Sequence, residues 1–190
     1  MKFGYLTFLV LFLLFGIESL SSPKLNEKYE YYNIYGDRAG KLREEMDKKS
    51  SARSGGQTYD AHTEWYVSWN FKYKKANNFY KITSITTDID IDYYMPRWKN
   101  SYRGSAELRQ RWDKYMRALA EHERGHKDLG VKAAREIESK IFRIKPQKSS
   151  NQLEKNANDL CQSIIAKYNQ LEVDYDFRTK HGETQGAVFE

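Results

Sequence analysis

The sequence is poor in cysteine: its 190 residues include one, Cys161. A single cysteine excludes a disulfide bond within the chain. The helical pattern around it places Cys161 beside Leu160 and Ile164, so we expect a buried thiol rather than one that pairs with another chain. The sequence also contains no internal repeat and no low-complexity tract.

Long apolar runs are absent beyond the first residues of the chain. Lys2, an apolar run over residues 3–17 and small residues up to Ser21 are typical of a secretory signal peptide. The run is shorter than the roughly 20 residues that a membrane span needs. We expect a signal peptide at 1–21, no stable membrane anchor after its cleavage, and one domain at 22–190 that is exported to the periplasm or the medium. A retained N-terminal anchor is the alternative.

Charge of one sign is not concentrated anywhere along the sequence. The chain has 32 basic and 26 acidic residues, a formal net charge of +6 and a pI near 9.2. Basic and acidic residues alternate, as in 41–49 and 109–117. A nucleic-acid-binding protein would gather its cations in one patch, so we expect no nucleic-acid partner and interpret these charges as solvated faces. Weak attraction to anionic cell-envelope polymers is compatible with the charge but not indicated by it.

Hydrophobic periodicity predicts an α+β fold in which a small antiparallel sheet packs against long helices. Proline is expected to end the sheet at Pro96 and the long helix at Pro146. From Asp174 onward the periodicity vanishes, which predicts an irregular tail. The expected strands are 28–35, 62–73 and 79–94, with a turn at Asn77–Asn78, and the expected helices are 38–49, 105–143 and 149–173.

The segment His122-Glu123-Arg124-Gly125-His126 indicates the chemistry. Residues four apart are neighbours on one face of a helix, so both imidazoles can reach a single Zn²⁺. Glu123 then lies beside the ion without ligating it. This is the zincin signature, in which the glutamate is the general base of a metalloprotease.

The helix around this motif supports a metal site. Both histidines lie on the stripe of large apolar residues, which we expect to be buried. Burying two imidazoles and a carboxylate is costly unless their polar atoms have partners, and a metal ion supplies one. A pair of hydrogen-bonded core histidines is the alternative. The stripe comprises Leu108, Trp112, Tyr115, Leu119, His122, His126, Leu129, Ala133 and Ile137.

A catalytic zinc ion usually has three protein ligands, so one more must come from elsewhere. The longer metzincin motif is excluded because Leu129 and Lys132 occupy the positions of its glycine and third histidine. Glutamates downstream, at Glu136, Glu138 and Glu154, are possible in principle. The first two lie on the same helix, too many turns away to reach the ion.

The C-terminal segment offers a better third ligand. His181 follows the second long helix, which returns antiparallel to the first, and we predict that it completes the site with His122 and His126. His62 is the competing histidine. Nearby, Asp176 can accept a hydrogen bond from a ligating imidazole, and Tyr175 can donate to a developing oxyanion.

Several motifs together resemble one known family, the bacterial predicted secreted zinc-dependent proteases catalogued as domain of unknown function 922. The resemblance covers roughly residues 29–186 and implies an exported bacterial protein with His122, His126 and His181 as ligands and Glu123 as base. Members often have a cysteine in the second strand that matches one in the last helix, but residues 78–81 here contain none. The motifs are His-Glu-Arg-Gly-His within the helix 112–137, Thr63-Glu64-Trp65-Tyr66-Val67-Ser68-Trp69, Met95-Pro96-Arg97-Trp98, and Tyr175-Asp176 followed by Thr179 and His181-Gly182.

The sequence therefore predicts a secreted or periplasmic zinc-dependent metallopeptidase. A zinc-activated water would hydrolyse bonds of a peptide or protein substrate, with Glu123 as general base. A base next to a ligand is not needed in a structural zinc site, and this favours an enzyme. The alternatives are a non-catalytic envelope protein with a structural zinc ion and a zinc amidase that acts on cell-wall peptides.

Overall fold

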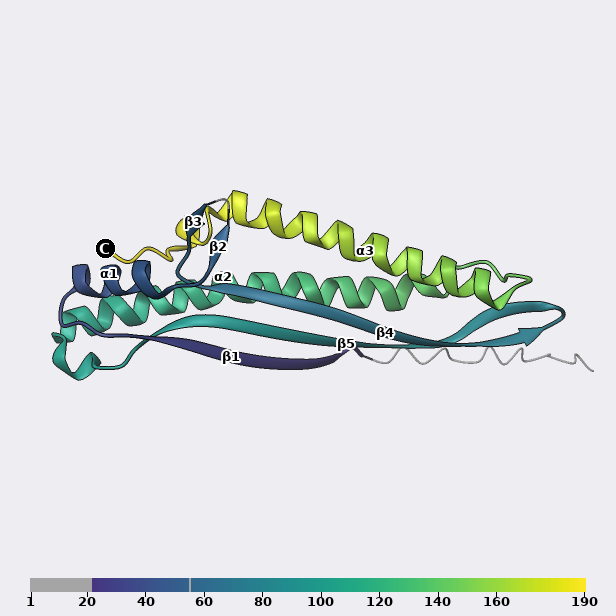
Figure 1. Cartoon of the computed structure of the whole chain (residues 1–190), viewed down its shortest axis with the longest axis horizontal. Coiled ribbons are helices and arrows are strands. Elements are labelled where there is room, and N and C mark those ends of the chain that lie inside the picture. Colours follow the sequence, from purple (N-terminus) through teal and green to yellow (C-terminus); the bar gives the residue numbers. More distant parts are fainter. Residues whose placement is uncertain (1–21, 55) are drawn as a thin grey trace, which may run out of the picture.

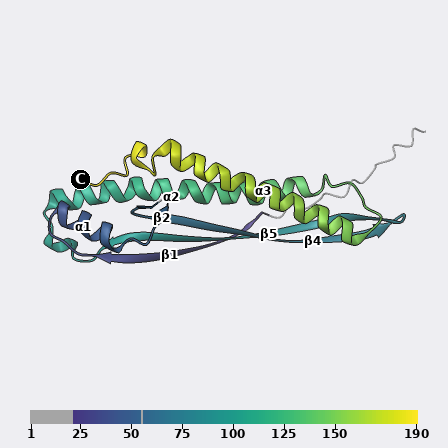
Figure 2. The ribbon, with the colours of Figure 1, turned by 45° about the horizontal axis from the view of Figure 1, so that its top comes forward.

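The computed structural model describes residues 22–54 and 56–190, so the expected signal peptide at 1–21 lies outside the described residues. The molecule is elongated, with two long helices lying along one side of a narrow sheet (Figures 1 and 2). In this part of the chain, no helix has both the length and the apolar character needed to cross a membrane.

The main sheet is mixed, whereas the sequence predicted an antiparallel one. Its strands are β1 (Lys24–Ile34), β4 (His62–Ala76) and β5 (Phe79–Trp98), in the order β1-β5-β4. β4 and β5 form an antiparallel hairpin, and β5 pairs with β1 in parallel. β1 and β4 run in opposite directions, and β5 lies between them. A strand that is antiparallel to β4 must then be parallel to β1.

Proline does not end the sheet. β5 continues through Pro96 to Trp98, whereas the prediction stopped the sheet region at the proline. β4 pairs with β5 only as far as Tyr94, so Pro96 lies where β5 has a single neighbour, β1. A strand tolerates a missing N–H at such an edge position. At the other end of the hairpin, Asn77 and Asn78 both have positive φ and form the predicted turn.

The three helices are α1 (Ala39–Lys49), α2 (Ala106–Ile141) and α3 (Ser150–Thr179). Ser105 caps the N-terminus of α2, because its side chain accepts a hydrogen bond from the backbone N–H of Leu108. Short pieces complete the described chain: the strands β2 (Arg53–Ser54) and β3 (Gln57–Thr58), and the 3₁₀ turns η1 (Ser101–Arg103) and η2 (Glu183–Gln185).

The irregular tail predicted from Asp174 is wrong, because α3 continues to Thr179. Apolar periodicity ends near Tyr168 since the last turns of α3 direct polar side chains inward, toward α2. Helical structure does not require an apolar stripe where polar groups find buried partners. The left-handed backbone of Lys180 then ends the helix.

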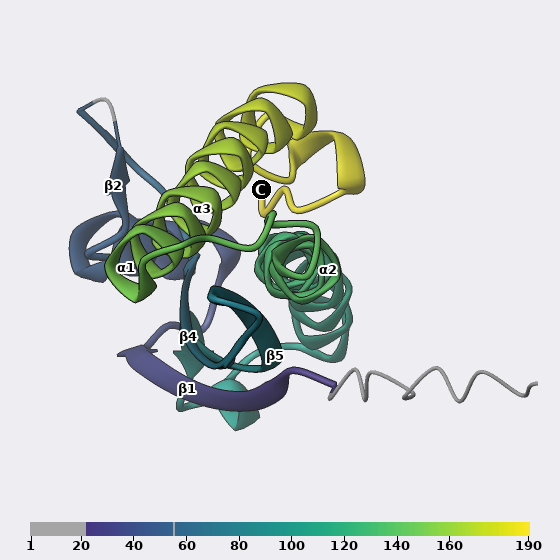
Figure 3. The ribbon, with the colours of Figure 1, turned by 90° about the vertical axis from the view of Figure 1, so that its right-hand side faces the viewer.

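The core lies between one face of the sheet and the helices α2 and α3, which Figure 3 shows together on one side of the strands. The predicted stripe of α2 is buried except for the half-buried Leu129, and both motif histidines are buried within it. Cys161 is fully buried as predicted, and burial raises the pKa of its thiol to about 11. This thiol is therefore a poor nucleophile.

Gly130 lets α2 approach β4 closely. A Cβ added at Gly130 would lie 2.8 Å from Cγ of Trp65, whereas one at Gly40 in α1 would meet nothing within 4 Å. We predict that Gly130→Ala lowers the free energy of unfolding by about 1–3 kcal/mol through overpacking. Gly40→Ala, the matched control, should leave it unchanged or raise it by up to about 1 kcal/mol. Urea denaturation followed by circular dichroism measures both; equal effects would contradict the close approach.

Candidate metal centre

Three side chains from two helices converge at one point. The Nε2 atoms of His122 and His126, one turn apart on α2, lie 3.4 Å from each other. Oδ1 of Asp176, in the last turns of α3, lies 3.2 Å from the first Nε2 and 3.0 Å from the second. Ligands on adjacent corners of a zinc tetrahedron with bonds near 2.0–2.1 Å are about 3.3 Å apart. In the described residues, this is the group that could hold a metal ion.

The other nitrogen of each imidazole has an oxygen partner. Nδ1 of His126 lies 3.3 Å from Oε1 of Glu172, and Nδ1 of His122 lies 3.0 Å from Oε1 of Gln185. A carboxylate only accepts hydrogen bonds, so Nδ1 of His126 carries the hydrogen in that pair. In a neutral ring, Nε2 then presents a lone pair to Asp176. This arrangement is typical of ligating histidines, whose second nitrogen donates to an outer partner.

Asp176 presents a buried oxygen that needs a positive charge. No donor of suitable hydrogen-bond geometry reaches its Oδ1 in the described part of the chain. Burial opposes the charge of His126, but the neighbouring carboxylates of Asp176 and Glu172 outweigh burial and raise the pKa of His126 to about 10. The same field that attracts a proton attracts a divalent cation, and metal binding releases such protons. The donor set therefore fits a metal ion.

Glu123 lies beside this point but is not part of the ligand triangle, the name used here for the three converging atoms of His122, His126 and Asp176. Its side chain is 2% exposed, and Oε2 accepts a hydrogen bond of 2.7 Å from Oγ1 of Thr63 at the start of β4. Burial raises the pKa of Glu123, although the hydrogen bond from Thr63 lowers it. A carboxylate in this state accepts a proton more readily than a solvated one.

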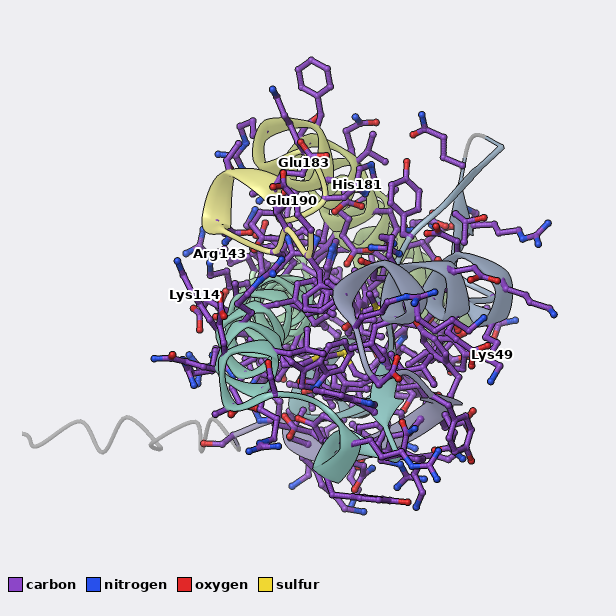
Figure 4. The ribbon with its side chains drawn as sticks, turned by 90° about the vertical axis from the view of Figure 1, so that its left-hand side faces the viewer. Lys49, Lys114, Arg143, His181, Glu183 and Glu190 are labelled. Atoms are coloured by element: carbon purple, nitrogen blue, oxygen red, sulfur yellow. The ribbon has the colours of Figure 1, made fainter. Side chains whose placement is uncertain are left out.

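His181 lies next to the triangle but outside it. Its Nδ1 is 3.5 Å from Oδ2 of Asp176, and its ring stacks on Tyr59 with the ring centroids 3.8 Å apart. Figure 4 shows His181 close to Glu183, just beyond the end of α3. The assignment of His181 as third ligand stays a prediction. The structure brings Asp176, expected only as an acceptor for an imidazole N–H, into that position.

The other candidate ligands lie elsewhere. His62 opens β4 as predicted, and its ring packs near Tyr94 rather than on the triangle. The three downstream glutamates each have a different partner: Glu136 pairs with Lys140 and Lys167, Glu138 accepts from Thr87, and Glu154 accepts from Tyr73.

Tyr175 packs behind the ligands. Its ring stacks on His122, and its hydroxyl donates to the backbone carbonyl oxygen of the same residue at 3.2 Å. Tyr175 is absent from the lining of the adjoining cavity. These contacts suit a role in positioning α3 against α2, and the role in oxyanion stabilisation considered above stays a prediction.

A cavity of about 1350 Å³ adjoins the triangle. Its walls come from α1 and α2, from the segment between β2 and β4, and from the end of α3 with the C-terminal residues. Asp60 fixes the second wall, because its carboxylate accepts hydrogen bonds from Arg43 and, at 2.6 Å, from Tyr115. The two histidines and Glu123 lie in this lining, so a molecule bound in the cavity can reach the triangle.

Sequence reasoning missed three residues of the centre. Glu172 precedes Asp176 by one helical turn, and an extended α3 would have placed both on one face. Thr63 belongs to a motif of the resembled family, but nothing in the sequence links it to Glu123. Gln185 lies in a polar tail with no pattern that could have identified it.

Comparison with known proteins identifies the family. The model of a family described as bacterial protein of unknown function (DUF922) matches residues 29–182. The chain belongs to this family. The match includes both helices that form the ligand triangle and ends one residue after His181. No curated protein and no solved structure matches the chain.

Gly125, within the histidine motif, makes room for Tyr175. A Cβ there would overlap the hydroxyl oxygen and Cζ of the tyrosine. We predict that Gly125→Ala lowers the free energy of unfolding by about 1–3 kcal/mol because the ring must shift. In a Tyr175→Ala background the same substitution should have little effect. A double-mutant cycle by urea denaturation measures this coupling. Additive effects would show that the contact is unimportant.

Proposed function

We propose that this DUF922 protein is an exported zinc-dependent metallopeptidase with a zincin-like centre. Export rests on the leader pattern at 1–21. The observation that supports the metal is the convergence of two imidazole nitrogens and one carboxylate oxygen with edges of 3.0–3.4 Å. We assign His122, His126 and Asp176 as its ligands, so that Asp176 replaces His181 in this role.

The chemistry is divided between the ion and the chain. A zinc ion held here would polarise the scissile carbonyl and acidify a water molecule. Glu123 takes a proton from the attacking water and returns it to the nitrogen of the leaving amine. Thr63 keeps the Glu123 carboxylate in place, and Glu172 and Gln185 fix the orientation of the two rings.

The cavity supports a peptide rather than a small molecule as substrate. Its volume of about 1350 Å³ exceeds the roughly 300–1,000 Å³ of typical small-molecule pockets. Side chains of the exposed Val173 and Phe177, one turn apart on α3, belong to its lining. They offer apolar contacts to a substrate side chain close to the reacting bond.

Zinc titration of point variants tests the ligand assignment. The processed protein should bind about one zinc ion per chain, and Asp176→Ala should weaken binding about 100-fold or more. His181→Ala should weaken it by only about 10-fold, because this histidine contacts a ligand, at 3.5 Å, rather than the ion. His62→Ala is the matched control and should match the parent. If His181→Ala removed binding and Asp176→Ala did not, His181 would be the third ligand.

Glu123→Gln tests the catalytic role. The amide has nearly the same shape but cannot accept a proton, so we expect retained zinc and a loss of peptide hydrolysis of about 100-fold or more. A quenched peptide library, with and without chelator, measures the activity. Hydrolysis of peptidoglycan fragments alone would favour an amidase. Zinc binding with no hydrolysis of either substrate would favour a structural zinc site, and full activity of the variant would exclude Glu123 as base.

A further inference from the structure

Two segments that contain basic but no acidic residues meet at one end of the molecule, whereas we expected from the sequence that basic and acidic residues are interleaved throughout. Residues 65–87 and 139–153 contain no Asp or Glu, and they include the tip of the β4–β5 hairpin and the connection from α2 to α3. Both lie at the same end of the molecule, away from the C-terminus (Figure 1). We call this surface the basic tip. It comprises the exposed Lys72, Lys74, Lys75, Lys81, Arg143, Lys145 and Lys148.

A backbone bridge holds the two parts of the basic tip together. The N–H of Tyr80 donates to the carbonyl oxygen of Gln147 at 2.7 Å, and the N–H of Gln147 donates back at 3.0 Å. The two hydrogen bonds form an isolated antiparallel β-bridge between Tyr80 of β5 and Gln147 of the connection from α2 to α3. The lysines of the hairpin and the cations at 143–148 therefore form one continuous surface.

The charges of the basic tip are not neutralised within the described chain. None of its seven cations forms an ion pair with a residue in 22–54 or 56–190. Lys74 lies directly opposite Lys81 in the hairpin register. Like charges in such a pair are destabilising. Seven cations also exceed the net charge of the whole chain, +6, so the remainder of the protein is close to neutral.

The basic tip also exposes an apolar side chain, next to the turn of the hairpin. Phe79 follows the Asn77–Asn78 turn and is 41% exposed. A polyanion would need only the cations, whereas the boundary of a lipid bilayer takes both a basic surface and an inserted aromatic ring. We propose that the basic tip docks the protein on the surface of a membrane that contains anionic phospholipids.

This docking would leave the metal centre free. β4 starts beside Glu123 at Thr63 and ends at Ala76 in the tip, a span of about 40 Å at 3.3 Å per residue. The cavity would then lie well outside the lipid headgroups. The proposal depends on the shape and charge of the fold and stands whether or not the centre is catalytic.

Sedimentation with vesicles tests the proposal. The chain from residue 22 includes every helix and strand of the described fold and lacks the apolar leader, which would itself bind lipid. It should bind mixed vesicles of phosphatidylcholine and phosphatidylglycerol and show little binding to phosphatidylcholine alone. Replacing Lys72, Lys74, Lys75 and Lys81 by Gln should weaken binding about 100-fold or more, because each cation contributes about fivefold near an anionic surface.

A matched variant separates the tip from net charge. Replacing Lys99, Arg111, Lys114 and Arg117 by Gln removes the same charge from exposed positions away from the tip, and binding should fall less than about 3-fold. Phe79→Ser should weaken binding without changing its salt dependence. Equal losses in the two quadruple variants, or binding to heparin but not to the mixed vesicles, would overturn the proposal. Unchanged circular dichroism would show that each variant is folded.

Discussion

The structure depends on one electrostatic constraint, the meeting of two imidazole lone pairs and a carboxylate oxygen in a buried place. His122 and His126 are held on α2 by its apolar stripe, and Asp176 is held at the end of α3. Such groups repel one another unless a proton or a cation lies between them. The packing of α2 against α3 is therefore coupled to what the centre binds. Gly125 contributes to this coupling. Its missing side chain leaves room for the Tyr175 ring, and the end of α3 can therefore pack close to the two histidines of α2.

The sequence predicted the elements better than their connections. Alternation identified the β4–β5 hairpin and its Asn77–Asn78 turn, and the 3.6-residue period identified α2 with its buried histidines. The parallel pairing of β1 with β5 was missed, because the order of strands in a sheet depends on contacts far apart in the chain. The end of α3 was missed because its inward face is polar, and a pattern of apolar residues cannot reveal a helix whose last turns serve a site.

The same limit explains the partial prediction of the centre. His122, Glu123 and His126 are close in sequence, so helix geometry alone brought them together. Asp176 was recognised only as a neighbour, because a segment read as irregular gives no direction to its side chains. The basic tip was missed for the same reason, because its cations come from segments far apart in the sequence. The lysines of β4 and β5 and the cations beyond α2 are separated by about 60 residues, and only the hairpin and the Tyr80–Gln147 bridge unite them.

Asp176 and His181 lie on different kinds of backbone at the end of α3, and this difference suits them to different roles. Asp176 belongs to a helix whose axis is fixed by a buried stripe, and a ligand on such an element is held more precisely than one on a loop. His181 follows in a left-handed conformation, where its ring stacks on Tyr59 and joins the C-terminal turn to the wall of the cavity. The first position suits holding an ion, and the second suits shaping the space beside it. Under the proposed assignment, the ion would have ligands from two rigid helices, and the segment between β2 and β4 and the C-terminal residues complete the cavity wall that these helices begin.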